Sequence, residues 1–154
     1  MRISTKAQYA VRAMVRLNLS TSGSPVSSKS ISEKEDISLS FLEQIFVKLR
    51  QAQLVQSIRG PGGGYKLARP ATEIRINEII ESVEQTLVPV ACMDDQGRCN
   101  CGEQCITHTV WEGLAQRIQH FLSSITLADL TRDALVQSPF ADGGGEASFS
   151  EEDK

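Results

Sequence analysis

Residues 28–68 read SKSISEKEDISLSFLEQIFVKLRQAQLVQSIRGPGGGYKLA, and this stretch carries the strongest indication of the fold. A short helix is predicted over Ser28–Glu35, followed by a tight connection at residues 36–38. A second helix is predicted from Ser40 to about Ala52, because Ser40 and Glu43 match the S-x-x-E capping box that opens helices. Its apolar side chains recur with helical spacing, at Leu42, Ile45, Phe46 and Leu49. Two short helices joined in this way are typical of a helix-turn-helix.

The end of the same stretch predicts a β-hairpin. Residues 54–58 and 65–68 read as short strands, and the loop between them is Arg59-Gly60-Pro61-Gly62-Gly63-Gly64, whose glycines permit positive φ. A helix-turn-helix followed by a hairpin is a winged helix. We therefore expect a protein that is mainly α with a small β-hairpin wing, a winged helix-turn-helix to which a long dimerisation helix is added further along the chain.

The charge of the chain is divided between its two ends. Residues 1–70 hold eleven Lys or Arg and four Asp or Glu, whereas residues 71–154 hold five Lys or Arg and fifteen Asp or Glu. The net charge of −3 is therefore the sum of a basic first half and an acidic second half. A basic winged helix suits double-stranded DNA, although scattered solvated charge is the alternative for this feature alone. The side chains expected to contact DNA lie on the second helix of the motif, at its start and at the foot of the wing: Ser38, Ser40, Glu43, Gln44, Lys48, Arg50 and Arg59.

Further helices are predicted on both sides of the winged helix. Residues 5–19 carry apolar side chains at helical spacing, and so do residues 75–85, which are expected to form a linking helix. Thr126 and Asp129 are placed to cap a last short helix that ends near residue 136. Residues 138–154 are acidic and rich in glycine, which is typical of a disordered tail.

A long helix with one apolar stripe is predicted before that last helix. Its apolar side chains step by three and four residues, at Trp111, Leu114, Ile118, Phe121 and Ile125. This spacing is typical of a coiled-coil seam. The alternative is that the stripe packs on the chain's own core, but a small winged helix has little surface left to cover so long a stripe. We therefore expect a homodimer joined through this helix.

All four cysteines of the chain lie close together, at Cys92, Cys99, Cys101 and Cys105, and His108 follows three residues after the last. The loop at residues 89–104 has no periodicity and needs something to hold it. Thiolates and imidazole favour zinc or an iron–sulfur cluster over magnesium or calcium, and the spacing alone does not choose between these two. Unligated thiols are the remaining alternative, although free cysteines tend to be buried singly.

Four motifs resemble the IscR family of iron–sulfur cluster regulators. They are MRISTKAQYAV at residues 1–11, ISLSFLEQ at 37–44, RGPGGGY at 59–65, and CITH at 105–108 with Trp111. The resemblance covers about residues 1–130. It implies a homodimeric winged-helix transcription factor that acts as repressor or activator of cluster-assembly genes. A cytoplasmic location is expected separately, because the sequence shows no membrane span and no apolar block of a signal peptide. The family binds a 2Fe-2S cluster, which the iron–sulfur assembly machinery supplies.

Carried over residue by residue, the resemblance implies that the cluster ligands are Cys92, Cys99, Cys105 and His108. The first interval departs from the family pattern, because six residues instead of five separate Cys92 from Cys99, and Cys101 is an additional thiol. An insertion of one residue in a loop costs little. Cys99 keeps the expected spacing to Cys105, so Cys101 is left as the alternative ligand.

These observations divide the chain into five parts. Residues 1–70 are expected to form the DNA-binding domain, 71–88 the linking helix, 89–104 the cluster-binding loop, 105–137 the dimerisation helix with a short C-terminal helix, and 138–154 the tail.

Other classes of protein fit the sequence less well. An enzyme is not expected, since the glycine run at residues 60–64 lacks the Gly-Lys-Ser/Thr of a P-loop and Cys105 is better suited to ligation than to catalysis. No apolar stretch approaches the roughly 20 residues of a membrane span, and charged residues interrupt the N-terminal segment where a signal peptide needs an apolar block. A zinc-stabilised DNA-binding regulator remains the alternative function.

Overall fold

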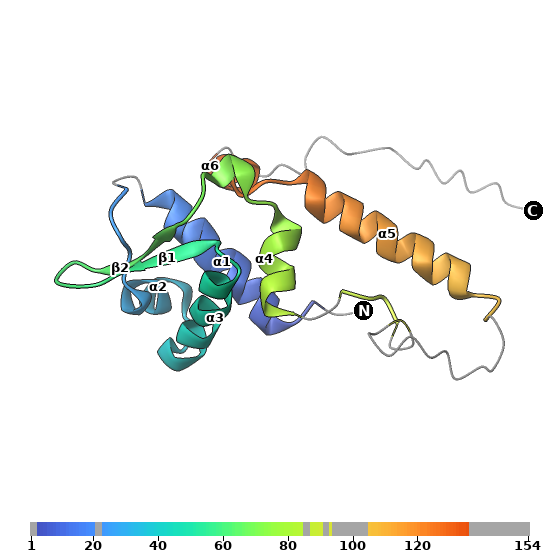
Figure 1. Cartoon of the computed structure of the whole chain (residues 1–154), viewed down its shortest axis with the longest axis horizontal. Coiled ribbons are helices and arrows are strands. Elements are labelled where there is room, and N and C mark those ends of the chain that lie inside the picture. The colour runs from blue at the N-terminus through green and yellow to red at the C-terminus, as the bar shows by residue number, and fades with distance from the viewer. Residues whose placement is uncertain (1–2, 21–22, 85–86, 91–92, 94–104, 136–154) are drawn as a thin grey trace, which may run out of the picture.

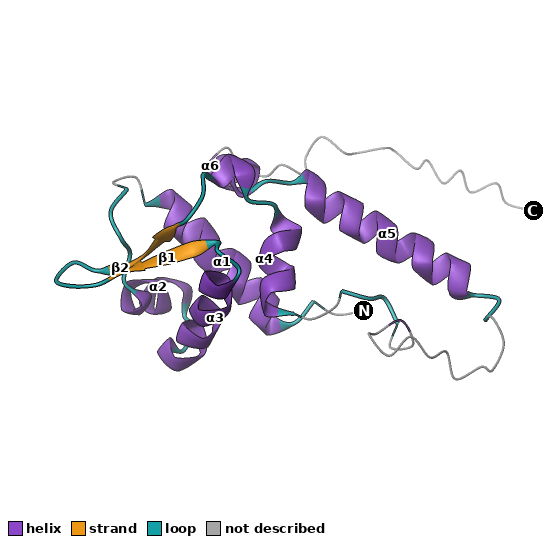
Figure 2. Cartoon of the chain, viewed as in Figure 1, coloured by secondary structure: helices purple, strands orange, loops and turns teal. Residues whose placement is uncertain are grey.

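The computed structural model describes residues 3–20, 23–84, 87–90, 93 and 105–135. The elements follow the order α1 (Thr5–Leu19), α2 (Ser28–Glu35), α3 (Leu39–Gln51), β1 (Val55–Ile58), β2 (Gly64–Leu67), the 3-10 turn η1 (Ala71–Glu73), α4 (Ile76–Val83), α5 (His108–Ser124) and α6 (Leu127–Leu135). Figure 1 shows that the elements from α1 to α4 gather with α6 into one body, from which α5 projects. Figure 2 shows the same arrangement coloured by element, with the paired strands β1 and β2 beside the helices. The predicted winged helix, mainly α with a small β-hairpin, is confirmed.

Helix α1 lies at the centre of the body and packs against α2, α3, α4, α6 and β2. Ser4 caps its N-terminus by accepting a hydrogen bond from the backbone N–H of Ala7 (3.1 Å). Its buried face carries three alanines, Ala7, Ala10 and Ala13, beside Met14 and Leu17. Small side chains allow neighbouring backbones to approach closely, so several helices share this one partner.

The turn between α2 and α3 depends on Asp36 and Ser38. Asp36 ends α2 in the left-handed conformation (φ 53°, ψ 49°), which turns the chain sharply. Ile37 is then buried in the core, and Ser38 caps α3 by accepting a hydrogen bond from the backbone N–H of Phe41 (3.3 Å). The predicted capping box of Ser40 with Glu43 is therefore wrong: Ser38 has the extended backbone that a cap requires, whereas Ser40 already lies in the first turn.

The wing is an antiparallel hairpin in which Val55 pairs with Leu67 and Ile58 with Gly64. A bridge between Val26 and Tyr65 ties the hairpin to the segment before α2, and the ring of Tyr65 stacks on Phe46 of α3 at a centroid distance of 4.2 Å. A Cβ atom at Gly64 would lie 2.3 Å from the carbonyl oxygen of Val26. The wing therefore meets the body closely enough to require glycine at this position.

Gly64→Ala is expected to lower the free energy of unfolding by about 2 kcal/mol, because the added methyl group forces Val26 and the wing apart. Gly62→Ala is the matched control: Gly62 also has a positive φ (73°), but open space surrounds its Cβ position. That change is expected to cost only about 1 kcal/mol of backbone strain. Urea unfolding of both variants measures the difference, and equal losses would contradict the close approach.

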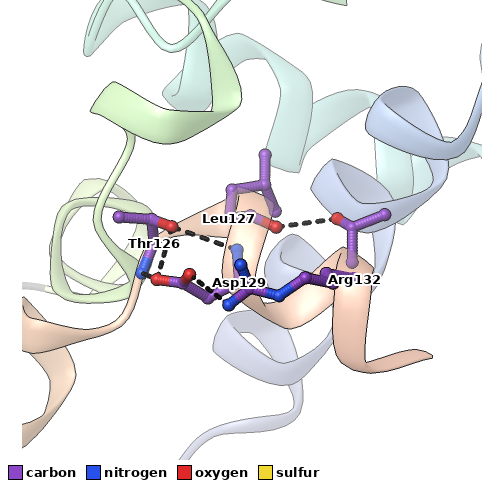
Figure 3. Close-up of polar contacts among 5 residues, drawn as sticks. Thr126, Leu127, Asp129 and Arg132 are labelled. Atoms are coloured by element: carbon purple, nitrogen blue, oxygen red, sulfur yellow. Dashed lines mark hydrogen bonds and ion pairs between the residues drawn. The ribbon is translucent and has the colours of Figure 1, made fainter. Parts of the chain in front are cut away.

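The chain after α5 returns to the body and completes its core. The backbone N–H of Leu127 donates to the carbonyl oxygen of Ile74 (2.8 Å), and the side chain of Leu127 is fully buried. Figure 3 shows the capping of α6: Thr126 and Asp129 exchange hydrogen bonds in both directions, and Arg132 pairs with the carboxylate of Asp129. The predicted cap of the last helix is confirmed, and α6 packs against α1.

Glu35 joins α2 to α1 through two arginines. Its carboxylate forms ion pairs with Arg12 (2.9 Å) and with Arg16. Partial burial raises the pKa of Glu35, but the hydrogen bonds and positive charges of Arg16 and Arg12 outweigh this effect, so that the pKa lies below its usual value of 4.5. The ionised carboxylate therefore stabilises the folded chain.

Glu35→Gln is expected to flatten the acid side of the stability profile. Because the pKa of Glu35 is lower in the folded than in the unfolded chain, its contribution is complete above the usual value of 4.5 and disappears as the pH falls through the lower, folded value. The variant should lose about 1 kcal/mol at pH 7. Glu33→Gln on the exposed side of α2 is the control, and urea unfolding between pH 7 and pH 3 is the measurement. An identical acid slope in Glu35→Gln and the unchanged protein would contradict the assignment.

Candidate DNA interface and ligand turn

The seven side chains predicted to contact DNA are all exposed. Ser38 stands at the start of α3, and Ser40, Glu43 and Gln44 share the helix surface turned away from the buried face. That buried face consists of Leu42, Ile45, Phe46 and Leu49. The structure thus brings the predicted polar residues of α3 together, since a helix places residues three and four positions apart on one side.

Basic residues flank this polar face. At about 100° per residue, Lys48 and Arg50 project from opposite shoulders of α3. Arg59 follows the last residue of β1, where the glycine-rich loop of the wing begins. Beyond Arg59, Gly60 and Gly62 have positive φ and open space around their Cβ positions. Because these glycines carry no side chain, the tip of the wing is narrow there. Figure 1 shows the hairpin tip projecting from the body.

One residue of this surface was not predicted. Val47 is 44% exposed and lies among the polar residues on the outer side of α3. The sequence could have indicated this position, because Val47 lies seven residues after Ser40, and residues i and i+7 share one helix face. It was missed because an apolar residue beside the buried positions of the same helix looks like part of the core pattern.

Cys105 and His108 are brought together at the N-terminus of α5. The backbone N–H of His108 donates to the carbonyl oxygen of Cys105 (2.9 Å), which closes a turn in front of the helix. The Sγ atom of Cys105 lies 3.0 Å from Oγ1 of Thr107, and that oxygen accepts a hydrogen bond from Nε1 of Trp111 (3.2 Å). Cys105 is half-buried, whereas His108 is exposed.

The other three predicted thiols, Cys92, Cys99 and Cys101, lie outside the described residues. Within residues 3–20, 23–84, 87–90, 93 and 105–135, no group of three or more His, Cys, Asp or Glu side chains is placed to hold a metal ion. The turn itself fits a soft metal or a cluster, because it carries one sulfur and one imidazole donor three positions apart.

Helix α5 has no buried residue. Two side chains of its predicted stripe are open to solvent, Leu114 (39% exposed) and Phe121 (52%), and so is Val110 beside the stripe (63%). At the end of the helix, Leu122 and Ile125 pack against the core, and Gln119 donates a hydrogen bond to Glu81 of α4 (2.6 Å). Within the described residues, the stripe is therefore covered at its C-terminal end and open at Leu114 and Phe121.

A winged helix-turn-helix with an exposed polar and basic face defines a DNA-binding transcriptional regulator. The chain belongs to the Rrf2 family, described as iron-dependent transcriptional regulators, which residues 3–133 match. No helix in the described part of the chain is long and apolar enough to cross a bilayer.

Similar proteins with known names are regulators of the same kind. The chain is 45% identical to the HTH-type transcriptional regulator IscR of Serratia proteamaculans, over 88% of this chain and 84% of that protein. It is 46% identical to IscR of Vibrio vulnificus, over 86% and 79%. These relatives are regulators rather than enzymes, as predicted for this chain.

Solved structures of two regulators share the fold. T. potens IscR has a TM-score of 0.74 and 38% sequence identity, covering 90% of this chain and 92% of that one. CymR, the global cysteine regulator of B. subtilis, has a TM-score of 0.73 and 32% identity, covering 86% and 97%. The predicted resemblance to IscR is confirmed.

Proposed function

We propose that the chain senses the supply of iron–sulfur clusters through a bound 2Fe-2S cluster and controls genes for cluster assembly. The observation that carries this proposal is the turn at the start of α5, where a backbone hydrogen bond joins His108, the first residue of the helix, to Cys105. The similarity to regulators named IscR supports it. Acting on bacterial DNA, such a regulator works in the cytoplasm.

The proposed ligands are Cys92, Cys99, Cys105 and His108, with Cys101 as the alternative to Cys99. A 2Fe-2S cluster held there supplies a coloured, oxidisable group whose presence reports on cluster supply. Thr107 accepts a hydrogen bond from Nε1 of Trp111 and contacts the sulfur of Cys105, which supports a defined position for this proposed ligand. The assembly machinery is the proposed donor. The division of the chain into five parts belongs to the same proposal.

Purification without oxygen, followed by measurement of iron, sulfide and zinc, tests this proposal. We expect two irons and two sulfides per chain and a brown protein with visible absorption. A colourless protein with one zinc per chain would establish the zinc-stabilised alternative, because d¹⁰ zinc has no such absorption.

On the DNA side, we propose that α3 enters the major groove and that the wing brings Arg59 to the minor groove. A narrow, A/T-rich minor groove attracts a guanidinium, and the glycine-rich tip is slim enough to approach it. Lys48 and Arg50 are suited to the phosphates on the two sides of α3. A homodimer joined through α5 would present two such modules to a pseudo-palindrome.

Glu43→Ala is expected to relax the preference at one base pair by about tenfold, because the carboxylate accepts a hydrogen bond from the amino group of cytosine. Stability should not change, since Ser38 rather than Ser40 caps α3 and Glu43 has no partner in a capping box. Binding to single-base variants of a selected site, together with thermal unfolding, measures both effects. A lower melting temperature with unchanged base preference would contradict this role.

A further inference from the structure

The outer face of α3 holds one apolar side chain among polar ones. At about 100° per residue, Ser40, Gln44, Val47 and Gln51 fall on one stripe of the helix. The buried residues of α3 occupy the opposite side. Val47, which is 44% exposed, is absent from the core cluster and lies in the middle of the stripe.

A single exposed apolar side chain is common on protein surfaces and has no meaning by itself. The residues around Val47 indicate a role for its exposed side chain. Gln44 and Gln51, one turn away on either side, are of a type that reads base edges through hydrogen bonds, and Lys48 and Arg50 on the shoulders are suited to phosphates. A base edge at the centre of this face therefore meets a side chain that neither donates nor accepts a hydrogen bond.

We propose that Val47 is a specificity-determining residue that contacts the C5 methyl group of a thymine in the major groove. That methyl group is the one apolar feature that the four standard bases present there. Val is β-branched and held in one rotamer in a helix, so its methyl groups are ordered before DNA binds. A cytosine at the same position carries only a hydrogen at C5, so the methyl contact with Val47 would be lost. The inference rests on the proposed placement of α3 in the major groove.

The test begins with duplexes that the full chain selects from a random library. Each thymine of the selected site is then replaced singly by deoxyuridine, which removes only the methyl group. We expect one thymine per half-site whose replacement weakens binding about fourfold, the equivalent of one buried methyl group at ~0.8 kcal/mol. In Val47→Ala the same replacement should have no effect, and Val47→Ile should restore the sensitivity.

Leu39→Ala is the matched control, because Leu39 is 40% exposed on the same helix but lies off the stripe. It should keep the sensitivity to deoxyuridine, and the thermal stability of Val47→Ala should equal that of the unchanged protein. If Val47→Ala responds to every replacement as the unchanged protein does, the assignment of Val47 is overturned while the DNA interface stands. If no defined sequence is selected at all, the placement of α3 in the major groove fails together with it.

Discussion

Cys105→Ala is expected to be a colourless protein that folds, dimerises and binds DNA with a changed choice of sites. Removing one of the four proposed ligands should abolish stable binding of the cluster. The fold should survive, because Cys105 precedes α5 and does not belong to the hydrophobic core. At sites that depend on the cluster, affinity should fall about tenfold, which is typical of coupling between two sites. Visible absorption, melting temperature and DNA titration measure the three effects.

Two further variants control this result. Cys101→Ala should keep its colour if Cys99 is the ligand, and His108→Cys should keep it because a thiolate replaces the imidazole. A Cys105→Ala protein that binds every site as the cluster-loaded protein does would contradict the proposed sensing. The cluster would then have no part in the choice of sites.

Helix α4, which precedes the proposed cluster-binding loop, is bonded to elements on both sides of it. Glu84 follows the last residue of α4, and its carboxylate accepts a hydrogen bond from the backbone N–H of Ser4, the cap of α1 (2.9 Å). Gln119 of α5 donates to Glu81 of α4 (2.6 Å). Helix α4 is thus bonded both to the cap of α1 and to α5, and it packs against α1 and α3, which supports coupling through α4.

Phe121→Glu is expected to convert the proposed dimer into a folded monomer. Phe121 is 52% exposed on a helix without buried residues, so the change should leave the melting temperature of the body nearly unaffected. In a two-fold dimer the loss occurs twice, at about 2 kcal/mol for each interface aromatic, and the dissociation constant should rise about thousandfold. Sedimentation over a range of concentrations is the measurement. Binding to a pseudo-palindrome should weaken in parallel.

Gln116→Glu adds the same charge on the opposite side of α5 and is the matched control. It should remain dimeric, because helical geometry places residue 116 away from the stripe. An unchanged association constant in Phe121→Glu would contradict an interface along this stripe, and a monomeric Gln116→Glu protein would show that added charge alone prevents association.

Local patterns in the sequence determined the elements and their order. The apolar positions of α4, Ile76, Ile79, Ile80 and Val83, are all buried as their spacing predicts. The glycine run and its flanking strands form the expected hairpin, and Thr126 with Asp129 caps α6. These features depend on residues a few positions apart, so propensity, periodicity and side-chain caps are sufficient to specify them.

Contacts between distant segments were decided only by the tertiary structure. Ser38 caps α3 in place of Ser40 because Asp36 turns the chain one residue before the buried Ile37, and the packing of Ile37 sets where the helix begins. Gly64 is required by Val26, 38 positions before it, and α6 returns from the end of α5 to bury Leu127 against the first half of the chain. Pattern within one segment cannot specify such positions, because they depend on which side chains from elsewhere compete for the same space.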